Sequence, residues 1–291
     1  MLSATSHREF AGSRFASTIF LERKLRAHVV RRDRLVYDSR YAPPGKKANA
    51  VAHLYVQLHG TFAPNGGTGV AGRQAWVLAE SEFDRVQPGS RTFRSFGEQA
   101  LVVEMRVPVA DLHRAVGIDH GQVEFPDAVW EAYDAIEQAP TEQALFTLIQ
   151  RLSEAGILSK DLASSIVPNE PERFARLWAV MKPLYEELST SASLKQIATI
   201  ARLSLRQLGR DLGDLSRTFG LFGGGFRDAS RVIRLRAATL FLSAPNATPS
   251  EVARTVGYGS LDAMGRAFRD ANLPSPSVVQ DAVKYRAGLE Q

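Results

Sequence analysis

The spacing of apolar residues divides the 291-residue chain into three regions. Up to about Leu112, apolar residues alternate with polar ones or form short blocks between turn residues, which is typical of β-strands. The predicted strands are His28–Arg31, Leu35–Tyr37, His53–Leu58, Trp76–Leu78, Thr92–Phe96 and Leu101–Val107. Turns rich in Pro and Gly separate them at 42–45, 64–67 and 87–90. Several short strands with this spacing indicate a small β-barrel or sandwich.

Over Pro126–Leu188 the apolar residues recur at helical spacing. One predicted helix follows Pro126, a second spans about 141–156, and a third starts near residue 171. Pro183 lies within the third pattern, so we expect a kink or a break there. The pattern leaves open whether these helices pack a dimer or only cover the core.

From Ser193 to Ala282 the chain is again helical and contains an internal repeat. Ser204–Leu212 aligns with Ser260–Phe268 through matching Ser, Leu, Gly-Arg and apolar positions. A short apolar helix precedes each copy, and Ile197-Ala198 in one corresponds to Val252-Ala253 in the other. A repeated supersecondary unit usually indicates that its function is repeated too.

The second copy has the residues of a helix-turn-helix unit. Thr248–Pro249 supplies an N-cap and a first helical residue, and Gly257 allows a sharp turn. Ser260 is the expected N-cap of the next helix, whose apolar side contains Met264 and Phe268. Such a unit places its second helix in the major groove of DNA.

The outer faces of the two second helices supply the candidate DNA contacts. They are Ser204, Arg206, Gln207, Arg210, Ser260, Asp262, Arg266 and Arg269. Arginine suits this role because its guanidinium can donate two hydrogen bonds to guanine, whereas a carboxylate accepts only from cytosine. From Ser193 onward fourteen Lys and Arg stand against eight Asp and Glu, while the preceding 192 residues are nearly neutral. A basic region attached to a neutral one is expected of a nucleic-acid binder.

Residues 193–280 resemble the DNA-binding part of the AraC/XylS family of bacterial regulators. The resemblance rests on Ser250-Glu251-Val252-Ala253, Gly257-Tyr258, Ser260, Arg266, Phe268-Arg269, Ser275-Pro276-Ser277 and the intervening Arg234-Leu235-Arg236-Ala237-Ala238. It implies two helix-turn-helix subdomains joined by a long helix, with their recognition helices in successive major grooves. It also implies an N-terminal effector-sensing or dimerisation domain, commonly a cupin-like barrel.

The chain departs from the family pattern at several positions. Asn272-Leu273 stands where Phe-Gly is usual, and Leu221–Gly225 looks like an insertion. Leu261 and Asp262 occupy positions that often hold polar base readers, so we expect the second unit to read fewer bases. Glycines within both recognition helices lower helix propensity and either admit close approach to DNA or are simply tolerated.

These patterns predict an α+β protein with three parts. A β-rich sensor or dimerisation domain is expected over 1–115, a helical linker over 116–188, and the tandem helix-turn-helix domain over 189–285. The predicted function is a cytoplasmic, sequence-specific and ligand-responsive transcription regulator, not an enzyme and without a cofactor. The expected partners are double-stranded DNA, a small-molecule effector, RNA polymerase and a second copy of the chain.

An alternative is a cupin-type metal enzyme fused to a DNA-binding module. It needs clustered ligands, and His28, His53, His59 and Glu104 are available. His53 and His59 share a strand face but are about 20 Å apart by strand rise, so no metal site is predicted. DNA repair by alkyl transfer needs an acceptor cysteine, and the chain has none.

Two further observations bound the interpretation. No run of eighteen apolar residues exists, so no membrane span is expected. The aromatic residues of the β-rich region either line an apolar pocket or pack the core. They are Tyr55, Trp76, Phe93 and Phe96.

Overall fold

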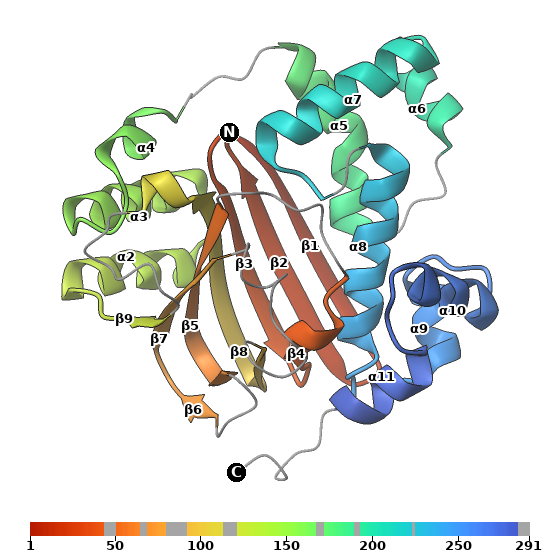
Figure 1. The fold of residues 1–291 in the computed structure, drawn as a ribbon, viewed down its shortest axis with the longest axis horizontal. Coiled ribbons are helices and arrows are strands. Elements are labelled where there is room, and N and C mark those ends of the chain that lie inside the picture. The colour runs from red at the N-terminus through yellow and green to blue at the C-terminus, as the bar shows by residue number, and fades with distance from the viewer. Residues whose placement is uncertain are drawn as a thin grey trace.

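A computed structural model describes residues 1–43, 51–64, 69–79, 92–112, 121–166, 172–188, 193–222 and 225–284. A sheet in the first part of the chain is flanked by helices on both sides (Figure 1). Its strands are β1 (Leu2–Phe10), β2 (Ser13–Leu21), β3 (Arg26–Asp33), β4 (Tyr37–Asp38), β5 (Val51–Pro64), β6 (Val70–Ala71), β7 (Gln74–Ala79), β8 (Phe93–Pro108) and β9 (Gly121–Val123). The predicted α+β class is confirmed.

The sheet is antiparallel, with the order β1-β2-β3-β8-β5-β7-β9; β4 pairs with β8, and β6 with β5. Among the residues that the structure describes, β1 and β9 do not pair with each other, so the sheet is open rather than a closed barrel. The two strands predicted over 92–107 are one strand, β8. The turns predicted at 64–67 and 87–90, and the end of the one at 42–45, lie outside the described residues.

The sequence pattern missed the first hairpin, β1–β2. Its turn is Ala11-Gly12, and both residues have positive φ, 48° and 81°. This is the conformation of a two-residue type I′ turn, which Asn-Gly or Asp-Gly usually signals. The dipeptide Ala11-Gly12 is not a typical signal of this turn, and the polar residues of β1 do not indicate a strand clearly.

Both faces of the sheet are covered, and alternate residues of one strand enter different cores. Leu54 and Val56 of β5 and Val103 of β8 pack with the helices that follow β9. Those helices are α2 (Asp127–Gln138), α3 (Glu142–Glu154) and α4 (Lys160–Ser164). On β2, Phe20 belongs to this core, whereas its neighbour Ile19 packs with the later helices on the opposite face. The strand β2 is therefore buried on both sides, which explains its apolar run Ile19–Leu21.

The remaining helices cover the opposite face and extend beyond it (Figure 1). They are α5 (Glu172–Glu187), α6 (Leu194–Ala201), α7 (Leu205–Phe219), α8 (Phe226–Phe241), α9 (Pro249–Thr255), α10 (Leu261–Asp270) and α11 (Pro276–Val283). No helix in the described part has the length and apolarity needed to cross a bilayer.

The sequence predicted a kink or a break at Pro183. The helix α5 continues through this residue, so the break does not occur. Met181, Leu184 and Tyr185 on either side of the proline are all buried in one core. We attribute the continuity to this packing, which offsets the backbone hydrogen bond that proline cannot donate.

The helix α8 joins two cores. Phe226, Ala229 and Ile233 in its first half pack with α5, α6 and α7. Leu235 and Phe241 in its second half pack with α9, α10 and α11. The predicted connecting helix between the two copies of the repeat is thus a single, largely buried element.

Candidate DNA-binding surface and ligand cavity

The first helix-turn-helix unit consists of α6 and α7. Ser204 is the N-cap of α7: its Oγ accepts a hydrogen bond from the Gln207 backbone N at 3.2 Å. The Gln207 side chain returns the contact, because its Oε1 accepts from the Ser204 backbone N at 3.1 Å. Arg202 in the turn has a positive φ of 55°, and Leu203 N donates to Ala198 O at 2.9 Å.

The second unit, α9 and α10, repeats this construction. Thr248 and Glu251 form a reciprocal cap at the start of α9, and Ser260 Oγ accepts from Ala263 N at 3.1 Å at the start of α10. Gly257 takes the left-handed position with a φ of 82°, and Tyr258 N donates to Ala253 O at 2.8 Å. The caps predicted at Thr248, Ser204 and Ser260 are therefore confirmed.

The two turns close with equivalent hydrogen bonds although their sequences differ. The bond from Leu203 to Ala198 and the bond from Tyr258 to Ala253 both span five residues. Arg202 occupies the place of Gly257, at a cost of about 1 kcal/mol for a left-handed residue with a Cβ. The geometry, more than residue identity, shows that the two copies are the same structural unit.

The recognition helices bury one side and expose the other. Leu208 and Leu212 of α7 are buried, as are Met264 and Phe268 of α10, in agreement with the predicted apolar stripes. The candidate contact residues are all exposed; they are Ser204, Arg206, Gln207, Arg210, Ser260, Asp262, Arg266 and Arg269. The structure thus places all eight at the surface, in two groups at the two recognition helices.

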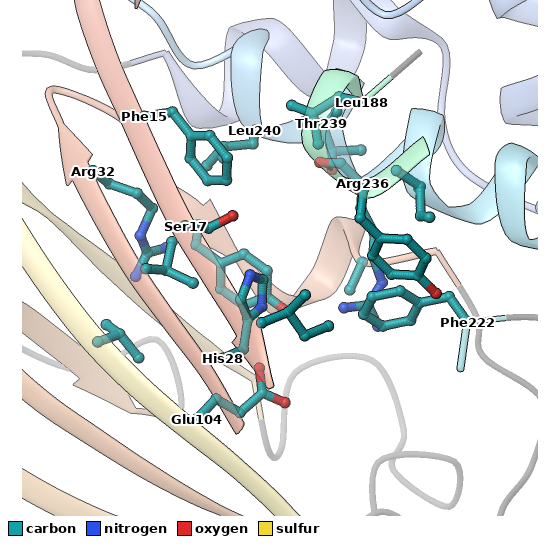
Figure 2. A pocket seen from close by; sticks show the side chains of 18 of the residues that line it. Phe15, Ser17, His28, Arg32, Glu104, Leu188, Phe222, Arg236, Thr239 and Leu240 are labelled. Atoms are coloured by element: carbon teal, nitrogen blue, oxygen red, sulfur yellow. Dashed lines mark hydrogen bonds between the residues drawn. The ribbon is translucent and has the colours of Figure 1, made fainter. Parts of the chain in front are cut away.

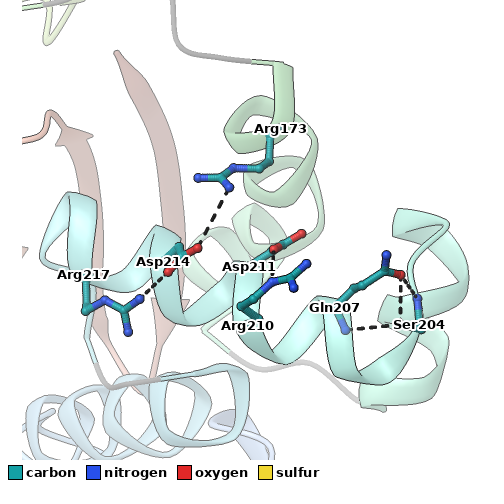
Figure 3. A network of polar contacts seen from close by, with 7 residues as sticks. All are labelled: Arg173, Ser204, Gln207, Arg210, Asp211, Asp214 and Arg217. Atoms are coloured by element: carbon teal, nitrogen blue, oxygen red, sulfur yellow. Dashed lines mark hydrogen bonds and ion pairs between the residues drawn. The ribbon is translucent and has the colours of Figure 1, made fainter.

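Apart from Arg206, the charged side chains of α7 already have partners (Figure 3). Arg210 Nε lies 3.4 Å from a carboxylate oxygen of the buried Asp211. Asp214 bonds to Arg217 and lies 4.0 Å from Arg173 of α5. In contrast, no hydrogen bond or ion pair within the described residues engages the guanidinium groups of Arg206, Arg266 and Arg269. Three of the four candidate arginines are thus free to bind another molecule.

A cavity of about 130 Å³, here the sheet–α8 cavity, lies between the sheet and α8. A single water needs about 10–15 Å³ on this measure, so the cavity has room for a small organic molecule. Figure 2 shows Phe15, His28 and Arg32 from the sheet across from Arg236 and Thr239 of α8. Most of its lining is apolar or aromatic, and it combines residues of the first strands with residues of α8.

A buried charged cluster lies beside this cavity. Burial raises the pKa of Glu104, but His53, Arg26 and Arg236 outweigh this effect, so its pKa lies below the ordinary value and the carboxylate is ionised. Desolvation lowers the pKa of His28 to about 4, which keeps the ring neutral near pH 7. The lining therefore combines apolar surface with a few fixed polar groups, as ligand pockets usually do.

Arg236 is one of the cavity residues with unused hydrogen-bonding capacity, and Arg32, whose buried Nε also has no partner among the described residues, is another. Its Cζ lies 4.4 Å from the ring centroid of Phe222, which is stacked by Arg26 at 4.5 Å as well. The buried Nε of Arg236 has no hydrogen-bond partner among the described residues. A buried unsatisfied donor is costly, so an acceptor from a bound molecule would stabilise this arrangement.

The sequence pattern did not identify this cavity. Its lining comes from strands, loops, α5 and α8, which are far apart in the chain and carry no common motif. Of the four aromatic residues considered from sequence, only Tyr55 lines it. Trp76 and Phe93 pack in a separate aromatic cluster with Phe62, and Phe96 packs elsewhere, so core packing was the correct alternative for these three.

The described residues contain no group of three His, Cys, Asp or Glu placed to hold a metal ion. His53 Nδ1 is hydrogen-bonded to Glu104, and His59 Nε2 lies 2.6 Å from Glu137 of α2. Two of the histidines available for a metal site are thus engaged with different carboxylates.

No protein-family model and no curated protein sequence matches the chain. Among solved structures, it is similar to ToxT from Vibrio cholerae, with 10% identity and a TM-score of 0.38 over 88% of this chain and 98% of that one. ToxT with a bound unsaturated fatty acid matches with 11% identity and a TM-score of 0.35, over 94% and 99% of the two chains. The AraC-like transcriptional activator CuxR matches with 13% identity and a TM-score of 0.33, over 88% and 92%. At such TM-scores we infer the function from the geometry of this chain.

Proposed function

We propose that the protein is a sequence-specific DNA-binding transcription regulator of the AraC/XylS type. The observation that carries the proposal is the pair of equivalent helix-turn-helix units, whose recognition helices expose Arg206, Arg266 and Arg269. Exposed arginines on a capped second helix fit the bidentate recognition of guanine in a major groove. The buried helix α8 connects the units and would hold both on one DNA molecule.

Genome-wide binding of the tagged full-length protein tests this proposal and names its targets. The double variant Arg206→Ala, Arg266→Ala should lose specific sites, because each bidentate contact contributes about 1–3 kcal/mol of discrimination. A matched control is Arg14→Ala, Arg151→Ala, which removes the same charge from exposed arginines on β2 and α3. Equal occupancy by wild type and both double variants would contradict the proposed recognition surface.

We further propose that the sheet–α8 cavity binds the effector. The mostly apolar lining and the unsatisfied Nε of Arg236 together favour an apolar molecule with an acidic group. The cavity is lined by Ile233 and Phe241, which belong to the cores of the first and second unit respectively. A bound molecule would therefore contact the helix that supports both DNA-binding units.

Thermal unfolding with unsaturated fatty acids and aromatic carboxylic acids tests the cavity. A ligand at a hundred times its Kd should stabilise the protein by about 2.7 kcal/mol. Arg236→Ala should abolish this shift, whereas Arg231→Ala, on the same helix but exposed and paired with Asp228, should preserve it. Stabilisation that persists in Arg236→Ala would place the acidic group elsewhere.

A further inference from the structure

Two exposed leucines occupy the same position in the two helix-turn-helix units. Leu205 and Leu261 directly follow the serine N-caps of α7 and α10, and their exposed fractions are 57% and 36%. They are among the few large apolar side chains that the described part of the chain leaves exposed. A single exposed leucine is ordinary, but the same exposure at equivalent positions indicates a surface that both units use.

A glycine lies one helical turn after each leucine, on the same face of the helix. These glycines are Gly209 and Gly265, and a Cβ built at either of them meets no atom within 4 Å. Neither has a positive φ, so neither the backbone conformation nor packing within the chain requires glycine. Glycine disfavours helix formation, yet both recognition helices have it at this place.

The surroundings of each pair are cationic. Arg206 and Arg210 flank the first pair, and Arg266 and Arg269 follow the second. The acidic neighbours are Asp262 inside the second pair, and Asp211 and Asp270, which directly follow Arg210 and Arg269. An apolar side chain among guanidinium groups fits a ligand that carries both negative charges and methyl groups. DNA is such a ligand, because thymine displays its methyl group in the major groove between the anionic backbones.

We propose that each Leu-x-x-x-Gly pair is a contact site for the C5 methyl group of thymine. The leucine side chain would cover the methyl, and the bare backbone at glycine would let the helix approach the base edges closely. This inference rests on the proposed DNA binding and adds the base that is read by apolar contact. It also gives Leu261 a role in reading DNA at a position where the sequence offers no polar reader.

Replacing thymine by deoxyuridine tests the site, since it removes the methyl group alone. A binding sequence is first selected with the full-length wild-type protein, and each thymine is then replaced in turn. One replacement in each recognised segment should weaken binding about fourfold, which corresponds to about 0.8 kcal/mol for one buried methyl-sized group. Leu205→Ala should lose this sensitivity in one segment and Leu261→Ala in the other.

Two controls separate recognition from folding. Val70→Ala removes a side chain that is 55% exposed on β6, and it should keep the sensitivity of the wild type to deoxyuridine in both segments. Gly209→Ala and Gly265→Ala should leave the melting temperature unchanged or raise it, while weakening binding to the selected DNA. A purely structural role for the glycines would instead leave DNA affinity unchanged.

The outcomes distinguish the two proposals. A wild-type protein that selects no sequence would overturn the proposed function and this contact site with it. Selective binding that is indifferent to deoxyuridine at every thymine would overturn the contact site alone. Full sensitivity retained by both leucine variants would do the same.

Discussion

The two helix-turn-helix units have one construction and different surroundings. Both have a serine-capped recognition helix and a turn closed by a hydrogen bond across five residues. Both units pack against α8, but α5 and strands β1 and β2 complete the core of the first, whereas α11, with Phe15 and Leu35, completes that of the second. The first also commits Arg210 and Gln207 to contacts within its own helix and cap, while Arg266 has no partner among the described residues.

This difference shows that two copies of one sequence motif can leave different numbers of their arginines free to bind another molecule. The repeated residues build the helix pair and its turn. Residues present in only one copy decide which cations are free: Asp211 pairs with Arg210, but Ala267 stands in the corresponding place beside Arg266. The unit predicted to read fewer bases therefore has the more accessible arginines.

The largest expected effect on stability comes from creating a cavity in the core of each unit, at equivalent positions. Leu212→Ala and Phe268→Ala remove buried side chains and should lower the free energy of unfolding by about 2–5 and 3–5 kcal/mol. In hydrogen exchange, Phe268→Ala should expose α9–α11 more than α6–α7, and Leu212→Ala should do the reverse. Equal loss of protection in both units for both variants would show that they unfold as one.

The next effect concerns the free and paired arginines. Arg266→Ala should weaken DNA binding by a factor of about 5 to 150, since one bidentate contact contributes about 1–3 kcal/mol. Arg210→Ala should have a smaller effect, because Asp211 already holds its guanidinium. Titration of a selected DNA site measures both. A larger loss for Arg210 than for Arg266 would reverse the comparison.

Substitutions at the left-handed position of each turn should have opposite effects on the stability of the protein. Gly257→Ala should destabilise the protein by about 1–2 kcal/mol, because a Cβ disfavours the positive φ at this position. Arg202→Gly should stabilise it by up to about 1 kcal/mol for the same reason. Gly259→Ala is the control: its φ is not positive and its Cβ would meet no atom, so denaturant unfolding should change little.

The smallest effect separates the two caps. Ser204→Ala and Ser260→Ala should each cost about 1 kcal/mol of stability. The loss at Ser204 should be the larger, because its Oγ also donates a hydrogen bond to Gln207 Oε1 at 2.9 Å, and Ala263 offers Ser260 no such acceptor. Thermal unfolding of the two variants makes the comparison, and a larger loss at Ser260 would show that this additional bond contributes nothing.

Local chemistry explains which features the sequence revealed. N-cap serines, Gly257 and the buried stripe of Met264 and Phe268 act within one helix pair, so spacing alone predicted them. The Ser204-x-x-Gln207 spacing is also that of a capping box, which explains why the Gln207 side chain accepts a hydrogen bond from the serine backbone.

Long-range features could not be predicted in this way. The sheet–α8 cavity is formed by strand residues such as His28 and by Arg236 on a distant helix, and only the folded chain brings them together. The continuity of α5 through Pro183 likewise depends on packing against other elements. The placement of the domain boundaries near 115 and 188 stays a prediction.

Footprinting on a natural binding site tests most directly whether the two units engage DNA together. One molecule should protect two segments about ten base pairs apart, with the segment of the second unit the more constant. Inserting five base pairs between the segments would move one recognition site to the opposite side of the duplex. The proposed arrangement predicts that this insertion strongly weakens binding; unimpaired binding would contradict it.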